Sequence, residues 1–425
     1  MTYLKEYRFL KEKFDQNPAQ IDLKELGLRI YNREFTSYYY NLLPGEKEYS
    51  CLEHHLTFKS RYQTRDYFHN DNLNRIINIS DSEIEENKKF IYSIFQCLPD
   101  KKVKREKRDG KGRSSQKGSG VIILLHGLNE KDWSKYLPWA RKLAELTQKK
   151  VILFPIAFHM NRAPASWSDP KTMRKIYLER KELSPNLSHS SFANTAMSTR
   201  LQMLPQRFLW SGLQTYHDII ELVREIKNGY HPLIHETENI DFFAYSVGSF
   251  LAILILMSNP YNYFSDSRVF NFCGGPTLNR MNATSKFILD SEANIAVYSF
   301  FIEHLEKEME KDERLAHYCS KLHPIGTFFR SMLDYHKMKD YREKRLHEIA
   351  RRIMALALLK DEVVPSSEVL NTLRGERHNI PIRVRIMDFK YEYNHVVPFP
   401  GKENIEKEVN KAFLSVFKTA ARFLK

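Results

Sequence analysis

Three side chains of the kinds that together perform nucleophilic catalysis follow separate apolar stretches of the chain. Ser246 stands in the motif AYSVG (244–248), with small residues two positions before and after it. Asp361 closely follows the apolar run RIMALALL, and His395 comes a few residues after IPIRVRIMDF. A serine hydroxyl is a weak nucleophile at neutral pH and needs a base, which an acid in turn holds in place. A serine, an acid and a histidine that follow predicted strands are therefore candidates for a catalytic triad.

The small residues around Ser246 suit a sharp strand-to-helix turn. Such a turn holds the serine in a strained backbone conformation with its hydroxyl exposed. Bulky side chains in place of Ala244 or Gly248 would clash with the neighbouring helix and strand. The turn also aims the start of the next helix and the amide of Val247 at a developing oxyanion. A serine that merely caps the helix is the simpler interpretation of the motif alone.

A fourth element lies upstream of the serine. The apolar run GVIILLHG (120–127) ends in His126 and Gly127, and Leu128 follows. Four such matches at predicted strand ends, in this order, resemble the α/β-hydrolase superfamily, whose nucleophile elbow reads G-x-S-x-G. This sequence departs from that elbow at Ala244, a residue small enough for the turn.

The resemblance implies a role for each of these residues. Ser246 would attack the substrate, His395 would carry the proton, and Asp361 would orient the histidine. The amides of Val247 and Leu128 would hold the oxyanion. Four further residues would be structural at the site: His126, Gly127, Ala244 and Gly248.

The triad assignment has alternatives. Glu362 or Asp388 could supply the acid, and Asp361 could simply cap the helix that follows. His395 could be an ordinary loop histidine, although no other histidine falls on the loop after the last predicted strand. Asp361 is favoured because it follows its strand immediately.

Alternating strands and helices must position these residues. Strands are expected at 120–127, 151–158, 239–246, 268–275, 352–359 and 380–389, and helices at 132–146, 211–227, 248–257 and 404–424. Near-continuous apolar strands that alternate with helices indicate a mostly parallel, doubly wound α/β sheet. Active sites of such sheets lie beyond the carboxyl ends of the strands, which is where Ser246, Asp361 and His395 fall.

The chain divides unevenly along its length. Its length predicts about two or three domains, or one large domain with additions. We expect an N-terminal α+β extension of unknown role over 1–108, a basic Gly/Ser linker over 109–119, and an α/β-hydrolase domain over 120–425. The superfamily resemblance covers about residues 118–425 and leaves the N-terminal extension uncovered.

Two long segments could shape a substrate pocket. The sequence of about 280–350 predicts helices inserted between core strands, where the superfamily often carries a helical cap. The Ser-rich segment at roughly 160–210 starts at the catalytic edge, and we predict that His159 and Trp167 contact the substrate. The simpler interpretations are a peripheral helical layer and a long surface loop.

The charge of the chain is unevenly distributed. The formal net charge is +14, and residues 101–117, with nine basic and two acidic side chains, carry half of it. Basic tracts can bind nucleic acid or anionic membranes. This tract has no aromatic residue for base stacking and is rich in Gly and Ser, so a solvated linker is favoured over a nucleic-acid site.

Several other classes are excluded by pattern. The longest uncharged segment, 242–265, has an apolar run of only eight residues, so no membrane span is expected. The charged N-terminus lacks the apolar core of a secretory signal, which favours a cytoplasmic protein. The cysteines form no C-x-x-C pair, and His231 and His235 flank Pro232 in an expected loop, so no metal site is predicted. No glycine-rich phosphate motif occurs, and no cofactor is implied.

These inferences converge on a serine hydrolase. It would cleave an ester, thioester or amide bond of a small acyl substrate through an acyl-enzyme, and the family analogy favours carboxylic esters. The alternative is a non-catalytic protein of the same fold that binds a partner through its cap or its N-terminal extension. An intact order of serine, acid and histidine speaks for the enzyme.

Overall fold

The computed structural model of the chain describes residues 1–45, 48–59, 71–98 and 120–425. A nine-stranded sheet has the order β1-β2-β5-β7-β6-β8-β9-β10-β11. Its strands are β1 (Gln20–Leu23), β2 (Leu28–Thr36), β5 (Lys89–Cys97), β6 (Val121–Leu125), β7 (Lys150–Leu153), β8 (Ile240–Tyr245), β9 (Val269–Phe272), β10 (Ile353–Leu358) and β11 (Arg383–Met387). The strands from β7 to β11 in this order run parallel, and β1, β2 and β5 pair antiparallel. This arrangement is the predicted α/β-hydrolase fold.

The central strands are apolar throughout because both faces of the sheet are covered. Every residue of β6 and β8 is buried. Successive side chains of a strand point to opposite faces. Ile123 and Leu125 therefore belong to one core cluster, and Ile122 and Leu124 belong to the other.

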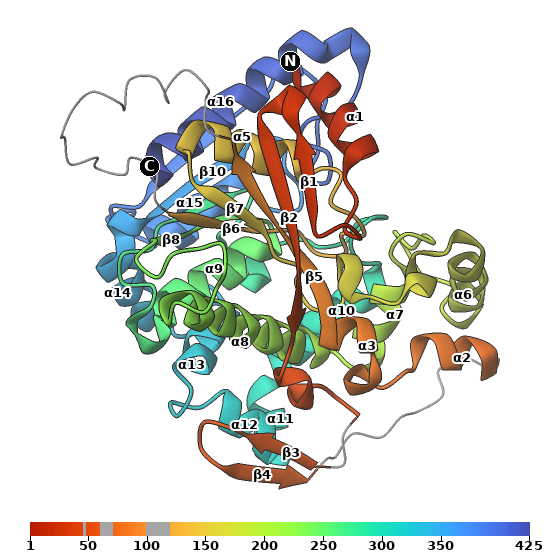
Figure 1. Cartoon of the computed structure of the whole chain (residues 1–425). Coiled ribbons are helices and arrows are strands. Elements are labelled where there is room, and N and C mark those ends of the chain that lie inside the picture. The colour runs from red at the N-terminus through yellow and green to blue at the C-terminus, as the bar shows by residue number, and fades with distance from the viewer. Residues whose placement is uncertain (46–47, 60–70, 99–119) are drawn as a thin grey trace, which may run out of the picture.

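Helices cover the two faces (Figure 1). On one face lie α1 (Tyr3–Lys13), α5 (Leu137–Thr147) and α16 (Glu406–Leu424), which contact one another. On the other lie α8 (Arg207–Lys227) and α9 (Val247–Ser258), with α15 (Ser366–Arg374) beside β10 and β11. The predicted helices at 132–146, 211–227, 248–257 and 404–424 correspond to α5, α8, α9 and α16.

The predicted helical insertion separates β9 from β10. It contains α10 (Ser291–Tyr298), a π-helical segment (Ser299–His304), α11 (Leu305–Lys311), α12 (Glu313–Tyr318), α13 (Pro324–Ser331) and α14 (Lys339–Ile349). Both α13 and α14 pack on α9, so the insertion is joined to the core.

The segment at roughly 160–210 is helical rather than a long surface loop. It holds α6 (Pro170–Leu183) and α7 (Thr195–Met203). The side chain of Asp169 caps α6 by accepting from the amide of Thr172 at 2.7 Å. Arg180 is buried and makes a two-pronged ion pair with Asp290, the N-cap of α10. Because a buried, paired arginine occupies a core position, the sequence of these helices lacks the apolar pattern of a packed helix.

The N-terminal extension contributes strands to the same sheet as the predicted hydrolase domain. β5 pairs with β7, with Ser93 opposite Leu153 and Phe95 opposite Val151. The predicted division at 109–119 thus separates segments whose strands are hydrogen-bonded neighbours. The linker itself lies outside the described residues. Two short helices, α2 (Asp71–Ile77) and α3 (Glu85–Lys88), precede β5.

A separate hairpin lies at the edge of the molecule. It consists of β3 (Glu48–Cys51) and β4 (Leu56–Lys59), and Figure 1 shows it beside α11 and α12. The guanidinium of Arg314, on α12, lies 3.5 Å from the centre of the Tyr49 ring. The hairpin is therefore attached to the helical insertion.

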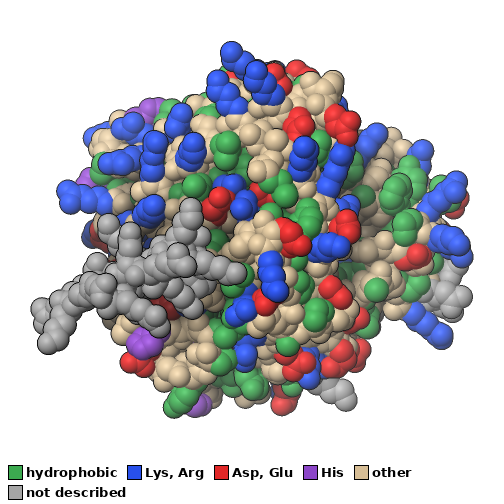
Figure 2. Space-filling model, turned by 45° about the horizontal axis from the view of Figure 1, so that its top comes forward, with side chains coloured by type: hydrophobic (Ala, Val, Ile, Leu, Met, Phe, Trp, Pro, Cys, Tyr) green, Lys and Arg blue, Asp and Glu red, His purple; other side chains and the backbone are tan. Residues whose placement is uncertain are grey.

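Charge is mixed on one exposed face of the molecule. Figure 2 shows Lys and Arg side chains spread over one face with Asp and Glu among them. None of the helices in the described part of the chain combines the length and the apolar composition that crossing a membrane requires.

Candidate active site

The loop that carries Ser246 is a tight turn between β8 and α9. Ser246 has φ 56° and ψ −123°, a conformation that is strained for any residue with a side chain. A Cβ added to Gly248 would lie 2.7 Å from the carbonyl oxygen of Leu125 and 2.8 Å from that of His126. Only glycine allows α9 to approach the end of β6 this closely, which explains the small residue that the motif requires.

Of the three predicted triad residues, His395 lies within hydrogen-bonding distance of both Ser246 and Asp361. His395 Nε2 is 2.8 Å from the hydroxyl of Ser246, and its Nδ1 is 2.7 Å from Asp361 Oδ2. All three residues are buried. A carboxylate can only accept from Nδ1–H, which leaves Nε2 unprotonated and able to accept from the serine. This tautomer is the one that a general base requires.

Asp361 is distinguished from the alternative acids by its contacts. Its Oδ1 accepts from the amides of Val363 and Val364 at 3.0 and 2.8 Å, so the carboxylate is fixed on both sides. Glu362 and Asp388 are exposed, and Asp388 accepts from a tyrosine hydroxyl. The helix after Asp361, α15, has no side-chain cap, which removes the capping role.

Two neighbours of the triad, Tyr245 and Cys273, were not predicted from the sequence as site residues. The Tyr245 ring stacks on His395 with centroids 5.3 Å apart, and its hydroxyl donates to the carbonyl oxygen of His395. Cys273 follows β9, and burial together with the nearby Asp361 carboxylate raises the pKa of its thiol well above the usual range. The thiol therefore stays neutral beside the acid.

His126 holds the loop after β6 through both of its ring nitrogens. Nδ1 donates to the carbonyl oxygen of Gly127 at 2.8 Å, and Nε2 accepts from the amide of Ile156 at 2.9 Å. Complete burial lowers the pKa of this imidazole well below its ordinary value, so it remains neutral. These contacts fit the structural role that the sequence implied.

A polar chain ties this loop to the one that carries His395. The amide of Gly127 donates to the hydroxyl of Tyr136 at 3.0 Å, which donates to Glu130 at 2.8 Å. Glu130 pairs with Lys135, whose ammonium also donates to the carbonyl oxygen of Val396 at 3.2 Å. Strand-end loops that are far apart in sequence are thereby held in one arrangement.

The two predicted oxyanion residues, Leu128 and Val247, line a cavity that Ser246 also lines. Val247 is the first residue of α9, and the first N–H groups of a helix have no acceptor within it. Leu128 and Val247 line two adjoining cavities, and Ser246 lines the second. The first residue of α9 therefore borders both cavities.

The two cavities are walled mainly by apolar side chains. The first lies under α8, α9 and α13, and its wall includes Leu213, Phe250, Ile325 and Phe329. The second lies under α10, and its wall includes Met281, Ile288 and Val297. Leu128, Val247 and Phe208 line both, so the cavities meet beside Ser246.

The two predicted substrate contacts have different placements. His159 lines the first cavity, and its Nδ1 donates to the carbonyl oxygen of Ala157 at 2.9 Å. Trp167 is packed in the core instead, where its indole donates to the carbonyl oxygen of Ile76 and Arg200 lies over its ring. That placement argues against a substrate contact for Trp167.

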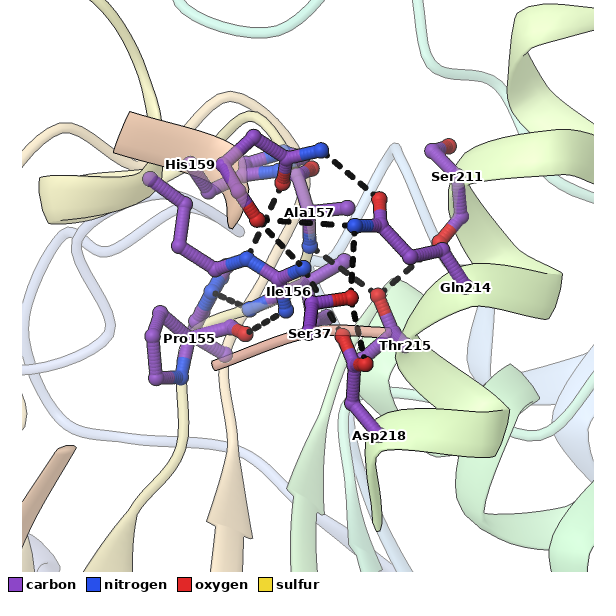
Figure 3. A network of polar contacts seen from close by, with 12 residues as sticks. Ser37, Pro155, Ile156, Ala157, His159, Ser211, Gln214, Thr215 and Asp218 are labelled. Atoms are coloured by element: carbon purple, nitrogen blue, oxygen red, sulfur yellow. Dashed lines mark hydrogen bonds and ion pairs between the residues drawn. The ribbon is translucent and has the colours of Figure 1, made fainter. Parts of the chain in front are cut away.

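A buried network fixes the backbone on which His159 lies. Figure 3 shows Thr215, Gln214 and Asp218 of α8 facing the segment after β7. Thr215 accepts from the amide of Ala157 at 3.0 Å, and Asp218 pairs with the fully buried Arg162 at 2.8 Å. The hydroxyl of Ser37, from the N-terminal extension, also donates to Asp218.

The histidines at 231 and 235 do not form a pair. His231 Nε2 contacts the hydroxyl of Tyr92 at 3.0 Å, whereas His235 Nδ1 contacts Thr237. The side chains serve separate local contacts.

Comparisons with known proteins were made for sequence and for structure. No curated protein matches the sequence. Similar solved structures include carboxyl esterase 2 of the mycorrhizal fungus Tuber melanosporum, at 8% identity over 80% of this chain and 82% of that one, with a TM-score of 0.42. A thermostable esterase of Pseudomonas putida is 9% identical over 99% and 89% of the two chains, with a TM-score of 0.40. The model of a family of unknown function, DUF6051, matches residues 1–425, and the chain belongs to that family.

Proposed function

We propose that the protein is a serine hydrolase that cleaves an ester, thioester or amide bond through an acyl-enzyme. The observation that carries this proposal is the unbroken hydrogen-bond chain from Ser246 through His395 to Asp361. Its serine lies on a strained turn at the end of a parallel strand, where a nucleophile is exposed to substrate.

The geometry supports a two-step reaction. Ser246 Oγ attacks the carbonyl carbon while its proton passes to His395 Nε2, and Asp361 stabilises the imidazolium that forms. The amides of Val247 and Leu128 donate to the oxyanion, each contributing about 3 kcal/mol to transition-state stabilisation. The imidazolium then protonates the leaving group, and the acyl group stays on the serine. Water, deprotonated by His395, releases the acid and restores the enzyme.

The walls of the cavities favour apolar substrates. Two apolar spaces that meet beside Ser246 fit a substrate with an apolar group on each side of the scissile carbonyl. A carboxylic ester of a medium-length acid meets that description. His159 is a polar group in the wall of the first cavity and suits a positioning role there.

The proposal is tested with a fluorophosphonate probe and with p-nitrophenyl esters of varied chain length. The unaltered chain should be labelled and should hydrolyse the esters, and Ser246→Ala should lose both. Ser249→Ala is the matched control, because Ser249 is a buried serine at the start of α9 whose hydroxyl donates to the carbonyl oxygen of Ala244. It should keep the label.

Two results would overturn the assignment. Equal labelling of Ser246→Ala and the unaltered chain would place the nucleophile elsewhere. Absence of labelling and of ester hydrolysis in the unaltered chain would favour a non-catalytic binding protein of the same fold.

A further inference from the structure

A second group of reactive side chains lies where the β3–β4 hairpin meets the helical insertion. Cys51 ends β3, His54 lies in the hairpin turn, His317 belongs to α12, and His323 directly precedes α13. One ligand atom from each residue can be chosen so that all four lie within 4.8 Å of one another. His54 is half-buried and the other three are buried.

The spacing of these atoms is close to that of a metal coordination sphere. Cys51 Sγ is 3.5 Å from both His54 Nδ1 and His323 Nε2, and the Nε2 atoms of His317 and His323 are 2.9 Å apart. Tetrahedral zinc with Zn–S bonds of about 2.3 Å and Zn–N bonds of about 2.0–2.1 Å separates its ligand atoms by roughly 3.3–3.6 Å. Small side-chain shifts would bring the four atoms onto such a tetrahedron.

A carboxylate supports the set from outside. Glu53 Oε2 lies 3.1 Å from His323 Nδ1. This contact places the ring proton on Nδ1 and leaves the lone pair of Nε2 directed toward Cys51 and His317. Histidine ligands in metal sites typically donate their second nitrogen to a carboxylate, which fixes the ring and raises its basicity.

We infer that Cys51, His54, His317 and His323 bind a single Zn²⁺ ion. One thiolate and three imidazoles form a borderline-soft, four-coordinate set of the kind that zinc prefers. Binding would release the proton of the Cys51 thiol to solvent, because the thiolate is the ligand. Four protein ligands complete the tetrahedron and leave no position for water, so the site is structural.

The ion would join two parts of the chain that are far apart in sequence. Cys51 and His323 are 272 positions apart. His323 directly precedes α13, and Ile325 and Phe329 of that helix line the first cavity beside the serine. A bound ion would therefore fix one wall of the pocket as well as the hairpin. The inference does not depend on the proposed hydrolase activity.

Metal analysis of the unaltered chain tests the inference directly. The protein, purified without a histidine tag, is incubated with zinc and dialysed, and its zinc content is measured. We expect one zinc per chain, and a strong chelator should lower the melting temperature. Replacement by Co²⁺ should give the near-ultraviolet absorption band of a cobalt–thiolate bond. Absence of tightly bound zinc in the unaltered, folded chain would overturn the inference.

Matched variants assign the ligands. Cys51→Ser and His323→Gln should lose most of the zinc, and Cys51→Ser should also lose the cobalt–thiolate band. Cys97→Ser and His304→Gln are the controls, since Cys97 and the exposed His304 lie outside the cluster. Both should retain one zinc per chain. Undiminished zinc in both cluster variants would overturn the assignment, and if neither variant folds, the measurements on the unaltered chain decide.

Discussion

Asp361 and Glu362 are adjacent carboxylates in very different surroundings. Asp361 is buried and accepts from two backbone amides and from His395, whereas Glu362 is exposed. The same chemical group is therefore held rigidly in one case and solvated in the other. Burial and preorganised donors, rather than residue type, decide which of them can orient a base.

Replacement of the acid should separate these two residues. In Asp361→Asn the amide can donate to Nδ1, which favours the tautomer with the proton on Nε2 facing Ser246. We expect kcat for a p-nitrophenyl ester to fall on the order of 10⁴-fold, with the fold retained by circular dichroism. Glu362→Gln and Asp388→Asn are the controls and should stay within about twofold. A larger loss in either control would identify a different acid.

The buried histidines should make stability sensitive to acid. Burial lowers the pKa of His159 from 6.5 to about 4. As the pH falls, His159 therefore becomes protonated in the unfolded chain before it does so in the folded one. Its contribution to the free energy of unfolding is complete above pH 6.5 and decreases as the pH falls from 6.5 to about 4. The loss from this residue is on the order of 3 kcal/mol.

Urea unfolding at several pH values measures this effect. His159→Asn should reduce the fall in the free energy of unfolding between pH 7 and pH 4.5. His235→Asn is the control, because His235 is exposed, and its pH dependence should match that of the unaltered chain. An unchanged slope in His159→Asn would refute the prediction.

At the scale of the elements, the close contact between α9 and β6 depends on the absence of a side chain at Gly248. Gly248→Ala would set a Cβ 2.7 Å from the carbonyl oxygen of Leu125, a backbone atom that cannot move alone. We expect a loss of about 2 kcal/mol in the free energy of unfolding, together with slower fluorophosphonate labelling as the serine turn shifts. Urea unfolding and labelling rates measure both effects.

Gly212→Ala is the matched control for that helix contact. Gly212 lies within α8, and a Cβ there would meet no atom within 4 Å beyond the neighbouring backbone of its own helix. Alanine is the better helix former, so we expect a gain of about 0.5–1 kcal/mol. Equal destabilisation by both substitutions would show that the close approach at Gly248 is not the cause.

The elements after residue 118 were predictable because their signals are local. Apolar runs bounded by glycine and polar residues mark β6, β8 and β10, and the residues that follow parallel strands meet at one edge. The positions of Ser246, Asp361 and His395 after predicted parallel strands therefore sufficed to predict that the three side chains lie close together. The helices α6 and α7 were missed because their buried positions include arginines, which polarity patterns assign to the surface.

Contacts between distant loops were not predictable in the same way. Lys135 donates to the carbonyl oxygen of Val396, and Tyr245 donates to that of His395. No spacing in the sequence predicts such contacts. The C-x-x-H pair at 51–54 and the histidines at 317 and 323 each look ordinary alone. Their convergence follows from where the hairpin packs, and that depends on tertiary contacts.

At the scale of the whole molecule, the net charge of +14 is unevenly distributed along the chain. Half of it belongs to residues 101–117, which lie outside the described residues. On the face in Figure 2, acidic side chains are spread among the basic ones. The solvated linker at this tract stays a prediction, and binding to nucleic acid measured against salt would test it.

The sheet makes the N-terminal extension part of the folding unit. In the complete chain, Val151, Ile152 and Leu153 of β7 are fully buried. Without β5, β7 would become an edge strand and these residues would be exposed. An exposed apolar edge favours aggregation. The extension also supplies Asp81 to two buried arginines of the 160–210 segment and Asn87 to Arg162. Removing partners from buried charges is strongly destabilising.

We therefore predict that residues 120–425 expressed alone are insoluble or unfolded, whereas co-expression with residues 1–108 as a separate chain restores a soluble complex. The restored complex should contain the two chains in equal amounts and should be labelled by the fluorophosphonate probe at Ser246, because the strand pairing of β5 with β7 needs no covalent link. Size-exclusion chromatography, circular dichroism and labelling measure these outcomes. A soluble, folded and labelled 120–425 fragment would show instead that the N-terminal strands are an independent addition to a complete hydrolase domain.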